Sequence, residues 1–81
     1  MYFIYILESL KDSNHYVGLT SDVDKRLKYH NSGYVKSTKH RMSFKLVYKE
    51  KYQTRLEARE REKYLKSYSG SKEKLSILEA L

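Results

Sequence analysis

Runs of apolar and aromatic residues in the chain predict the strands of a small sheet. Residues 2–7 are uninterrupted apolar or aromatic positions rich in β-forming residues, which indicates a strand covered on both faces. A polar, turn-forming connection at residues 8–14 leads to a second run at residues 15–20, and the two runs are expected to pair as a β-hairpin. Residues 44–48 alternate loosely and predict a third strand.

Helical spacing of apolar residues begins directly after the hairpin. Ser21 is placed to cap this helix, and Asp24 three residues later completes a capping-box-like pair. The face expected to point inward carries Val23, Leu27 and His30. Gly33 can adopt the left-handed conformation that ends a helix, and a basic, polar loop is expected at residues 34–43.

Two further helices are predicted after the third strand. Thr54 and Glu57 form a capping box for a helix over residues 56–68. The residues expected to share its apolar face are Ala58, Leu65 and Tyr68. Gly70 breaks this helix, and a short terminal helix is predicted at residues 72–81. Its apolar positions are Leu75, Leu78 and Leu81.

The order ββαβαα predicts an α+β fold, a three-stranded antiparallel sheet flanked by helices. With 81 residues there is material for one core, so we expect a single domain over residues 1–81. The sequence has no cysteine, no zinc-finger spacing of its three histidines and no apolar run near the ~18 residues of a membrane span. No leader is visible either, and we expect a cytoplasmic protein with no membrane partner.

Positive charge is concentrated in one segment. Seventeen Lys and Arg against ten Asp and Glu give a net charge of +7, and residues 25–49 hold eight of the bases and none of the acids. Such clustering is the electrostatic footprint of a phosphate-binding surface, although a solubilising charged face is the plainer alternative. We therefore expect a nucleic-acid partner. The residues expected to bind it are Lys25, Lys36, Lys39, His40 and Arg41.

One carboxylate is unexpectedly placed. Glu62 lies four residues after Ala58 and three before Leu65, on the apolar face of its helix. A carboxylate in such a place must be paired, protonated or bound to a metal. An ion pair with a neighbouring arginine is the plainer interpretation, and one hard divalent cation, shared with waters and a substrate phosphate, is the functional one.

Two other pairs of residues are candidates for chemistry. Arg26 and His30 share a helix face, as residues four apart do. Tyr5 and Tyr16 lie on the two strands of the hairpin, where they could be a packing pair or could orient a water or a phosphate oxygen.

Gly18, inside the second strand, marks a bulge or a close backbone approach. The three isolated glycines form no phosphate loop, so we expect no nucleotide cofactor.

Taken in order, these residues resemble the motifs of the GIY-YIG nuclease superfamily. Phe3-Ile4-Tyr5 and Tyr16-Val17-Gly18 correspond to its two naming motifs, with Phe3 in place of a glycine and Val17 in place of an isoleucine. Arg26, His30 and the acidic helix around Glu62 follow at similar spacings. The resemblance covers nearly the whole chain and is strongest to small stand-alone bacterial members.

The resemblance implies a metal-dependent endonuclease that cleaves DNA phosphodiester bonds, directed by DNA structure or damage, as in DNA repair. In that family pattern, Glu62 would hold one Mg²⁺ or Mn²⁺, and Arg26 would bind the scissile phosphate. Tyr5, Tyr16 and His30 would surround the attacking water, with one of them as general base, and the pattern does not fix which. Some relatives carry an asparagine after the acidic helix, and this chain has none there.

Two alternatives remain open at this stage. The chain could be a non-catalytic nucleic-acid-binding module that retains the fold, or a basic protein associated with RNA. The presence of every expected site residue favours the enzyme over the binding module. A monomer and a homodimer are equally compatible with the sequence.

Overall fold

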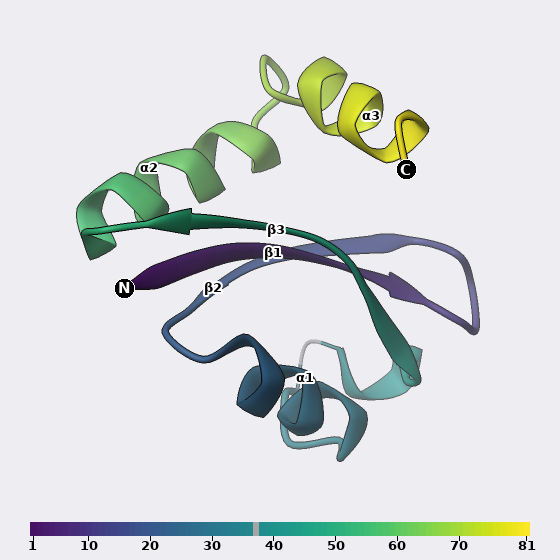
Figure 1. Cartoon of the computed structure of the whole chain (residues 1–81). Helices are drawn as coiled ribbons and strands as arrows, with labels where there is room; N and C mark the ends of the chain where they lie inside the picture. The colour runs from purple at the N-terminus through teal and green to yellow at the C-terminus, as the bar shows by residue number, and fades with distance from the viewer. Residues whose placement is uncertain (37) are drawn as a thin grey trace.

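A three-stranded antiparallel sheet separates the helices into two layers (Figure 1). The structure, a computed structural model, describes residues 1–36 and 38–81, so Ser37 of the predicted loop lies outside the described residues. The strands are β1 (Tyr2–Ser9), β2 (His15–Thr20) and β3 (Phe44–Tyr52). Their order in the sheet is β2-β1-β3, so the first strand is central and the hairpin partner β2 forms one edge.

The helices lie on opposite faces of this sheet. α1 (Val23–Asn31) covers one face, and α2 (Arg55–Lys66) and α3 (Ser71–Glu79) cover the other (Figure 1). A short 3-10 helix, η1 (Lys39–Arg41), precedes β3. The predicted α+β fold and the order ββαβαα are therefore confirmed.

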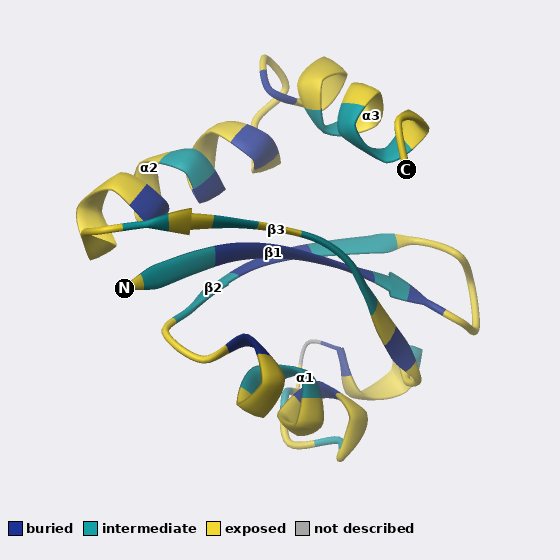
Figure 2. Ribbon diagram, viewed as in Figure 1, coloured by how far each residue is buried: buried dark blue, intermediate teal, exposed yellow. Residues whose placement is uncertain are grey.

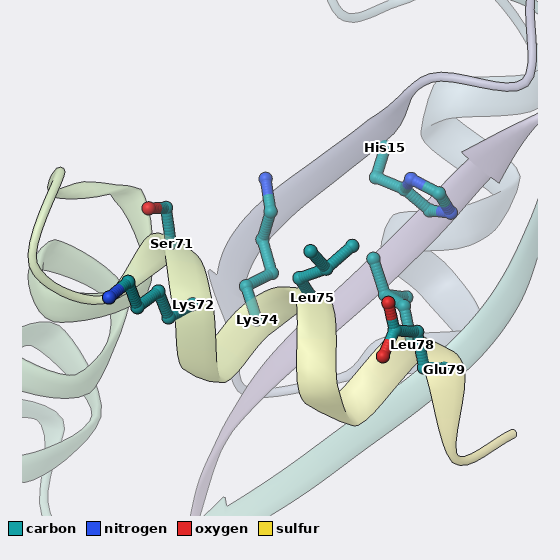
Figure 3. A pocket seen from close by; sticks show the side chains of 7 residues that line it. All are labelled: His15, Ser71, Lys72, Lys74, Leu75, Leu78 and Glu79. Carbon is teal, nitrogen blue, oxygen red and sulfur yellow. The ribbon is translucent and has the colours of Figure 1, made fainter.

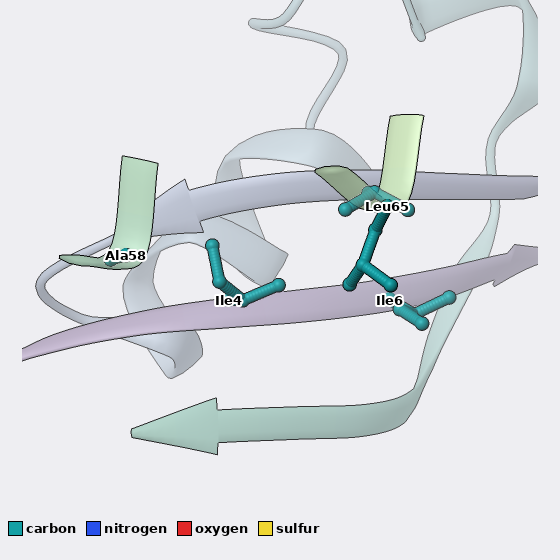
Figure 4. Packing of buried hydrophobic residues seen from close by; sticks show 5 residues of the cluster. Ile4, Ile6, Ala58 and Leu65 are labelled. Carbon is teal, nitrogen blue, oxygen red and sulfur yellow. The ribbon is translucent and has the colours of Figure 1, made fainter. Parts of the chain in front are cut away.

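The central strand is buried on both faces, as its unbroken apolar run predicts (Figure 2). Because strand side chains alternate between faces, neighbours in β1 enter two different cores. Ile4 and Ile6 enter the core under α2, with Val17, Ala58 and Leu65 (Figure 4). On the α1 face, the core consists of Tyr5, Leu7, Val23 and Phe44.

Two predicted features of helix ends are confirmed, and the predicted cap of α1 is wrong. Thr54 and Glu57 do form a capping box, and Gly33, just after α1, has φ of +80°. The expectation that Ser21 caps α1 is wrong. Asp22 is the cap, because its carboxylate accepts a hydrogen bond of 3.1 Å from the backbone N–H of Lys25.

The predicted ends of β3 and α2 are also corrected. The third strand does not end at residue 48, because its ladder with β1 continues to the pair of Tyr2 and Tyr52. The second helix ends at Lys66, so Tyr68 lies beyond it and is 95% exposed instead of sharing the apolar face.

The predicted apolar face of the terminal helix is confirmed for Leu78 and wrong for Leu75 and Leu81. Ile77 and Leu78 pack on the core, whereas Leu75 and Leu81 are exposed. Within residues 1–36 and 38–81, no helix is long and apolar enough to cross a membrane.

A hydrogen-bonded charge network joins β3 to both helices on its face. The Glu50 carboxylate accepts from the Tyr48 hydroxyl at 2.5 Å, from the Tyr52 hydroxyl at 2.6 Å and from Arg61 Nε at 2.9 Å. Arg61 also donates to the Glu73 carboxylate on α3. Burial alone would raise the pKa of Glu50, but the hydrogen bonds from Arg61, Tyr48 and Tyr52 outweigh it and lower the pKa to about 2.

We expect Glu50→Gln to lower the free energy of unfolding by about 2–3 kcal/mol, because it leaves the Arg61 guanidinium without its main partner. A lowered carboxyl pKa stabilises the fold above the unfolded value of 4.5 and loses that effect as pH falls towards about 2. The wild type should therefore lose more stability than Glu50→Gln between pH 5 and pH 2, as measured by urea unfolding. The control is Glu60→Gln, an exposed position on α2. Identical pH profiles for Glu50→Gln and the wild type would contradict this role.

Candidate active site

The Tyr5 ring lies across the edge strand β2. Tyr5 is paired with Gly18 in the β1–β2 ladder. A Cβ atom built on Gly18 would lie 2.3 Å from the Tyr5 hydroxyl oxygen and 2.4 Å from Cζ. Only glycine leaves room for the ring here, and the close approach expected at Gly18 is confirmed. The absent side chain brings the Tyr5 hydroxyl towards the β2 edge of the sheet.

Behind this hydroxyl is a fully buried polar chain. The Tyr5 hydroxyl lies 3.0 Å from His30 Nε2, and His30 Nδ1 lies 2.8 Å from Thr38 Oγ1. The Thr38 hydroxyl donates to the carbonyl oxygen of Val35. Thr38 then accepts from Nδ1, which leaves Nε2 to accept from the Tyr5 hydroxyl. His30 and Thr38 are both 0% exposed, so this chain ends in the protein interior.

Burial sets the protonation of these groups. Burial raises the pKa of Tyr5 to about 12, against the lowering effect of Arg26. Burial and the Arg26 charge together lower the pKa of His30 to about 4. Polar contact with the Tyr5 hydroxyl raises the pKa of Arg26. At neutral pH the site therefore holds a neutral phenol, a neutral imidazole and one fixed positive charge.

Tyr16 completes the aromatic side of the site. Its ring centroid is 6.2 Å from that of Tyr5 and 4.9 Å from that of His30, with the His30 contact edge-to-face. Tyr16 is paired with Leu7 in the ladder, so the two tyrosines share a face diagonally and are not directly opposed.

Glu62 approaches the same edge from α2. Its side chain is only 9% exposed, and both carboxylate oxygens are paired: Oε1 lies 3.0 Å from Arg59 Nη1, and Oε2 lies 3.2 Å from Lys66 Nζ. The ion pair expected for this buried carboxylate is confirmed, with a lysine as well as an arginine. Lys66 Nζ also lies 5.6 Å from the Tyr16 ring centroid, so α2 side chains reach around the edge of β2. The Glu62 charge acts on Tyr5, whose pKa it helps to raise.

The structure thus brings Tyr5, Tyr16 and His30 into contact, with Arg26 close enough to affect the pKa of Tyr5 and of His30. Glu62 lies on α2, on the other face of the sheet, and its partner Lys66 reaches the Tyr16 ring. Among the residues described, no three His, Cys, Asp or Glu side chains are grouped to hold a metal. Glu62 would be the protein ligand of a single Mg²⁺, which takes its other oxygens from waters and a phosphate. A nearly buried carboxylate that borders a depression of about 270 Å³ fits such an ion.

The predicted nucleic-acid-binding residues have different surroundings. Lys25 and Arg26 both line a depression of about 220 Å³ at the start of α1. Lys36, Lys39 and His40 are exposed on the loop before β3. Arg41 is more engaged with the protein: its Nε lies 3.4 Å from Asp12, and its guanidinium lies 5.8 Å from the Phe44 ring centroid. These five residues remain predicted phosphate contacts.

Thr38 is a site residue that the sequence did not indicate. It follows directly on the one undescribed residue, in a segment expected to be a polar loop, yet it is fully buried against His30. The sequence could not indicate its burial, because residues 34–43 have no helix or strand periodicity that separates buried from exposed positions.

A larger depression, about 460 Å³, lies elsewhere, between α3 and the start of β2 (Figure 3). Leu75 and Leu78 project from α3 into the space below His15 in this view. None of the five predicted catalytic residues lines it. Its apolar lining makes it a poor place for phosphate chemistry. Of the five predicted catalytic residues, Glu62 lines the depression of about 270 Å³ and Arg26 lines the depression of about 220 Å³ at the start of α1.

The chain is similar to several known proteins. A family model described as the GIY-YIG catalytic domain matches residues 1–75. UPF0213 protein YazA of Bacillus subtilis is 38% identical over 79 residues, covering 96% of this chain and 79% of that protein. UPF0213 protein SSP2268 of Staphylococcus saprophyticus is 40% identical over 78 residues, covering 95% and 93% respectively. The solution NMR structure of UPF0213 protein BH0048 from Bacillus halodurans matches with a TM-score of 0.56 and 37% identity, covering 95% of this chain and 85% of that one.

Proposed function

The chain belongs to the GIY-YIG family of nucleases, and we propose from this that it is a divalent-metal-dependent endonuclease that hydrolyses DNA phosphodiester bonds. The observation that carries the proposal is a nearly buried carboxylate, Glu62, whose partner Lys66 reaches the ring of Tyr16, while Tyr5 and Arg26 lie close enough to affect each other's pKa. In this set Glu62 suits a hard cation and Arg26 suits a phosphate. Few contacts in it could read base sequence, which favours a substrate chosen by DNA structure or damage.

Two charges divide the work on the phosphate. When bound, one Mg²⁺ or Mn²⁺ supplies Lewis-acid stabilisation of the phosphate oxygens. Glu62 would hold that ion, and the Arg26 guanidinium would donate to the non-bridging oxygens of the scissile phosphate. Arg26 lies close enough to the Tyr5 hydroxyl for that contact to raise the Arg26 pKa, so its positive charge is available beside the hydroxyl.

Tyr5 and His30 together accept the proton of the attacking water. With a pKa of about 12, Tyr5 keeps its proton at neutral pH and is not a ready-made base. The Tyr5 oxygen instead accepts a proton from water while its own proton passes to Nε2 of His30, 3.0 Å away. Thr38 holds the imidazole in the tautomer that can accept it. Tyr16 packs against His30 and limits its rotation.

A second candidate is a non-catalytic DNA-binding module. The observation that favours it is the pairing of Glu62 with Arg59 and Lys66, which satisfies the carboxylate with no metal. Cleavage is what separates the two candidates. An RNA substrate forms a third case, distinguished by a requirement for the 2′-hydroxyl.

We expect the full chain to cut labelled DNA only when Mg²⁺ or Mn²⁺ is present. The test is a panel of single-stranded, duplex, flapped, nicked and branched DNA, with an RNA strand of the same sequence, at low salt, with metal or with EDTA. Glu62→Ala, purified in parallel, controls for a contaminating nuclease. Cutting that disappears both in EDTA and in the variant supports the endonuclease. Binding without cutting on every substrate supports the binding module.

A further inference from the structure

Three basic side chains of α2 form a stripe beside Glu62. Arg59, Lys63 and Lys66 are spaced i, i+4 and i+7, and with Glu62 and Ser67 they line the depression of about 270 Å³. The stripe is about 10 Å long at 1.5 Å per helical residue. Phosphates of one DNA strand follow each other at a rise of about 3.4 Å along the helix axis. The stripe is therefore long enough for more than one backbone phosphate.

The stripe lies outside the basic segment at residues 25–49, and nothing in its own helix explains an excess of positive charge there. Glu62 is the one acidic residue that lines the depression with them, and it balances one of the three cations. The side chains of Arg59 and Lys66 are 55% and 48% exposed, so both can change partner without disturbing a core. This differs from Arg61 on the same helix, whose guanidinium is held by Glu50 and Glu73.

Metal and cations compete for the same atoms of Glu62. Arg59 contacts Oε1 and Lys66 contacts Oε2, so a divalent cation coordinated by this carboxylate would lie against two positive charges, and its binding is favoured when one of them moves away. The displaced ammonium or guanidinium then needs another anion. A phosphate next to the scissile one is the anion that arrives with the substrate.

We propose that Arg59, Lys63 and Lys66 form a subsite for backbone phosphates of the nucleic-acid strand next to the scissile bond, and that the strand draws Lys66 away from Glu62 and so opens the carboxylate to the metal. This inference rests on the proposed function. Metal binding and nucleic-acid binding then strengthen each other. A phosphate that binds Lys66 frees Glu62 for the metal, and a metal bound to Glu62 frees Lys66 for the phosphate. Arg59 and Lys66 keep Glu62 neutralised when no substrate is present.

Binding measurements on the intact chain test the subsite without relying on cleavage. Lys66→Gln should bind Mn²⁺ about threefold to tenfold tighter than the wild type by calorimetry without DNA, because a competing cation is gone. In EDTA, the same variant and Lys63→Gln should each reduce the salt dependence of binding to a single-stranded oligonucleotide by about 0.7 in log–log slope. Lys66→Arg, which keeps the positive charge, should resemble the wild type in both its Mn²⁺ affinity and its salt slope.

The control is Lys51→Gln, the same charge change on β3, at the opposite edge of the sheet from β2. Thermal melting confirms that each variant is folded. The subsite is refuted if Lys63→Gln and Lys66→Gln change the salt slope no more than Lys51→Gln does, or if Lys66→Gln binds Mn²⁺ no tighter than a wild type that does bind it. A wild type that binds no Mn²⁺ instead overturns the proposed function, and the salt slopes then decide the subsite alone.

Discussion

Glu62→Gln should abolish metal-dependent cleavage, with a loss of at least about 10³-fold in rate, while DNA affinity stays within about threefold of the wild type. Glutamine has nearly the same shape, and its one carbonyl oxygen can still accept from Arg59 or from Lys66, while the other exposed cation turns to solvent, so the local packing of α2 is kept. What it lacks is the negative charge that a hard divalent cation requires. Removing one negative charge from a basic surface should, if anything, tighten phosphate binding.

Two measurements make this result specific to the metal. Single-turnover cleavage at rising Mn²⁺ should show no recovery in Glu62→Gln, because the carboxylate itself is missing. Glu60→Gln, an exposed position on the same helix, carries the same charge change and should cleave like the wild type. If Glu62→Gln loses DNA binding together with cleavage, Glu62 is a structural residue and its assignment as the metal ligand is contradicted.

The burial of Glu62 illustrates what helical periodicity can predict. On a helix that begins at the capping box of Thr54 and Glu57, a residue four positions after Ala58 and three before Leu65 shares their buried face, and that residue is Glu62. The same reasoning predicted the inward face of His30 on α1. Strand and helix periods therefore predicted the sheet, the order of its elements and the side chains that the two helices offer to the site.

Contacts between segments distant in sequence were not predictable in this way. The burial of Thr38 depends on where α1 places His30, and the pairing of Arg41 with Asp12 depends on how the loop packs beside the hairpin turn. The terminal helix failed for a related reason. Its apolar residues occupy more than one face, and docking on the core selects Ile77 and Leu78 over Leu75.

Gly18→Ala should be the most damaging of the small substitutions, although it adds a single methyl group. Its Cβ would lie 2.3 Å from the Tyr5 hydroxyl oxygen, and the Tyr5 ring, only 1% exposed, has little freedom to move aside. We expect the free energy of unfolding to fall by about 1–3 kcal/mol from this overpacking. Cleavage should fall by about 10²-fold or more in protein that is still folded, because the Tyr5 oxygen leaves His30 Nε2 and Arg26.

The matched control for Gly18→Ala is Gly33→Ala, which adds the same methyl group away from Tyr5. Gly33 has φ of +80°, but the nearest side-chain atom to a Cβ there, Met42 Sδ, is 3.5 Å away, so the change strains the backbone by about 1 kcal/mol without filling occupied space. It should destabilise the protein to a similar extent and still cleave DNA. Combining Gly18→Ala with Tyr5→Leu should recover stability, since the smaller side chain leaves room for the methyl group, but not cleavage.

If Gly18→Ala retains full activity, the hydroxyl held across Gly18 has no part in the reaction. If Gly33→Ala loses as much activity as Gly18→Ala, the loss follows stability and not the placement of Tyr5.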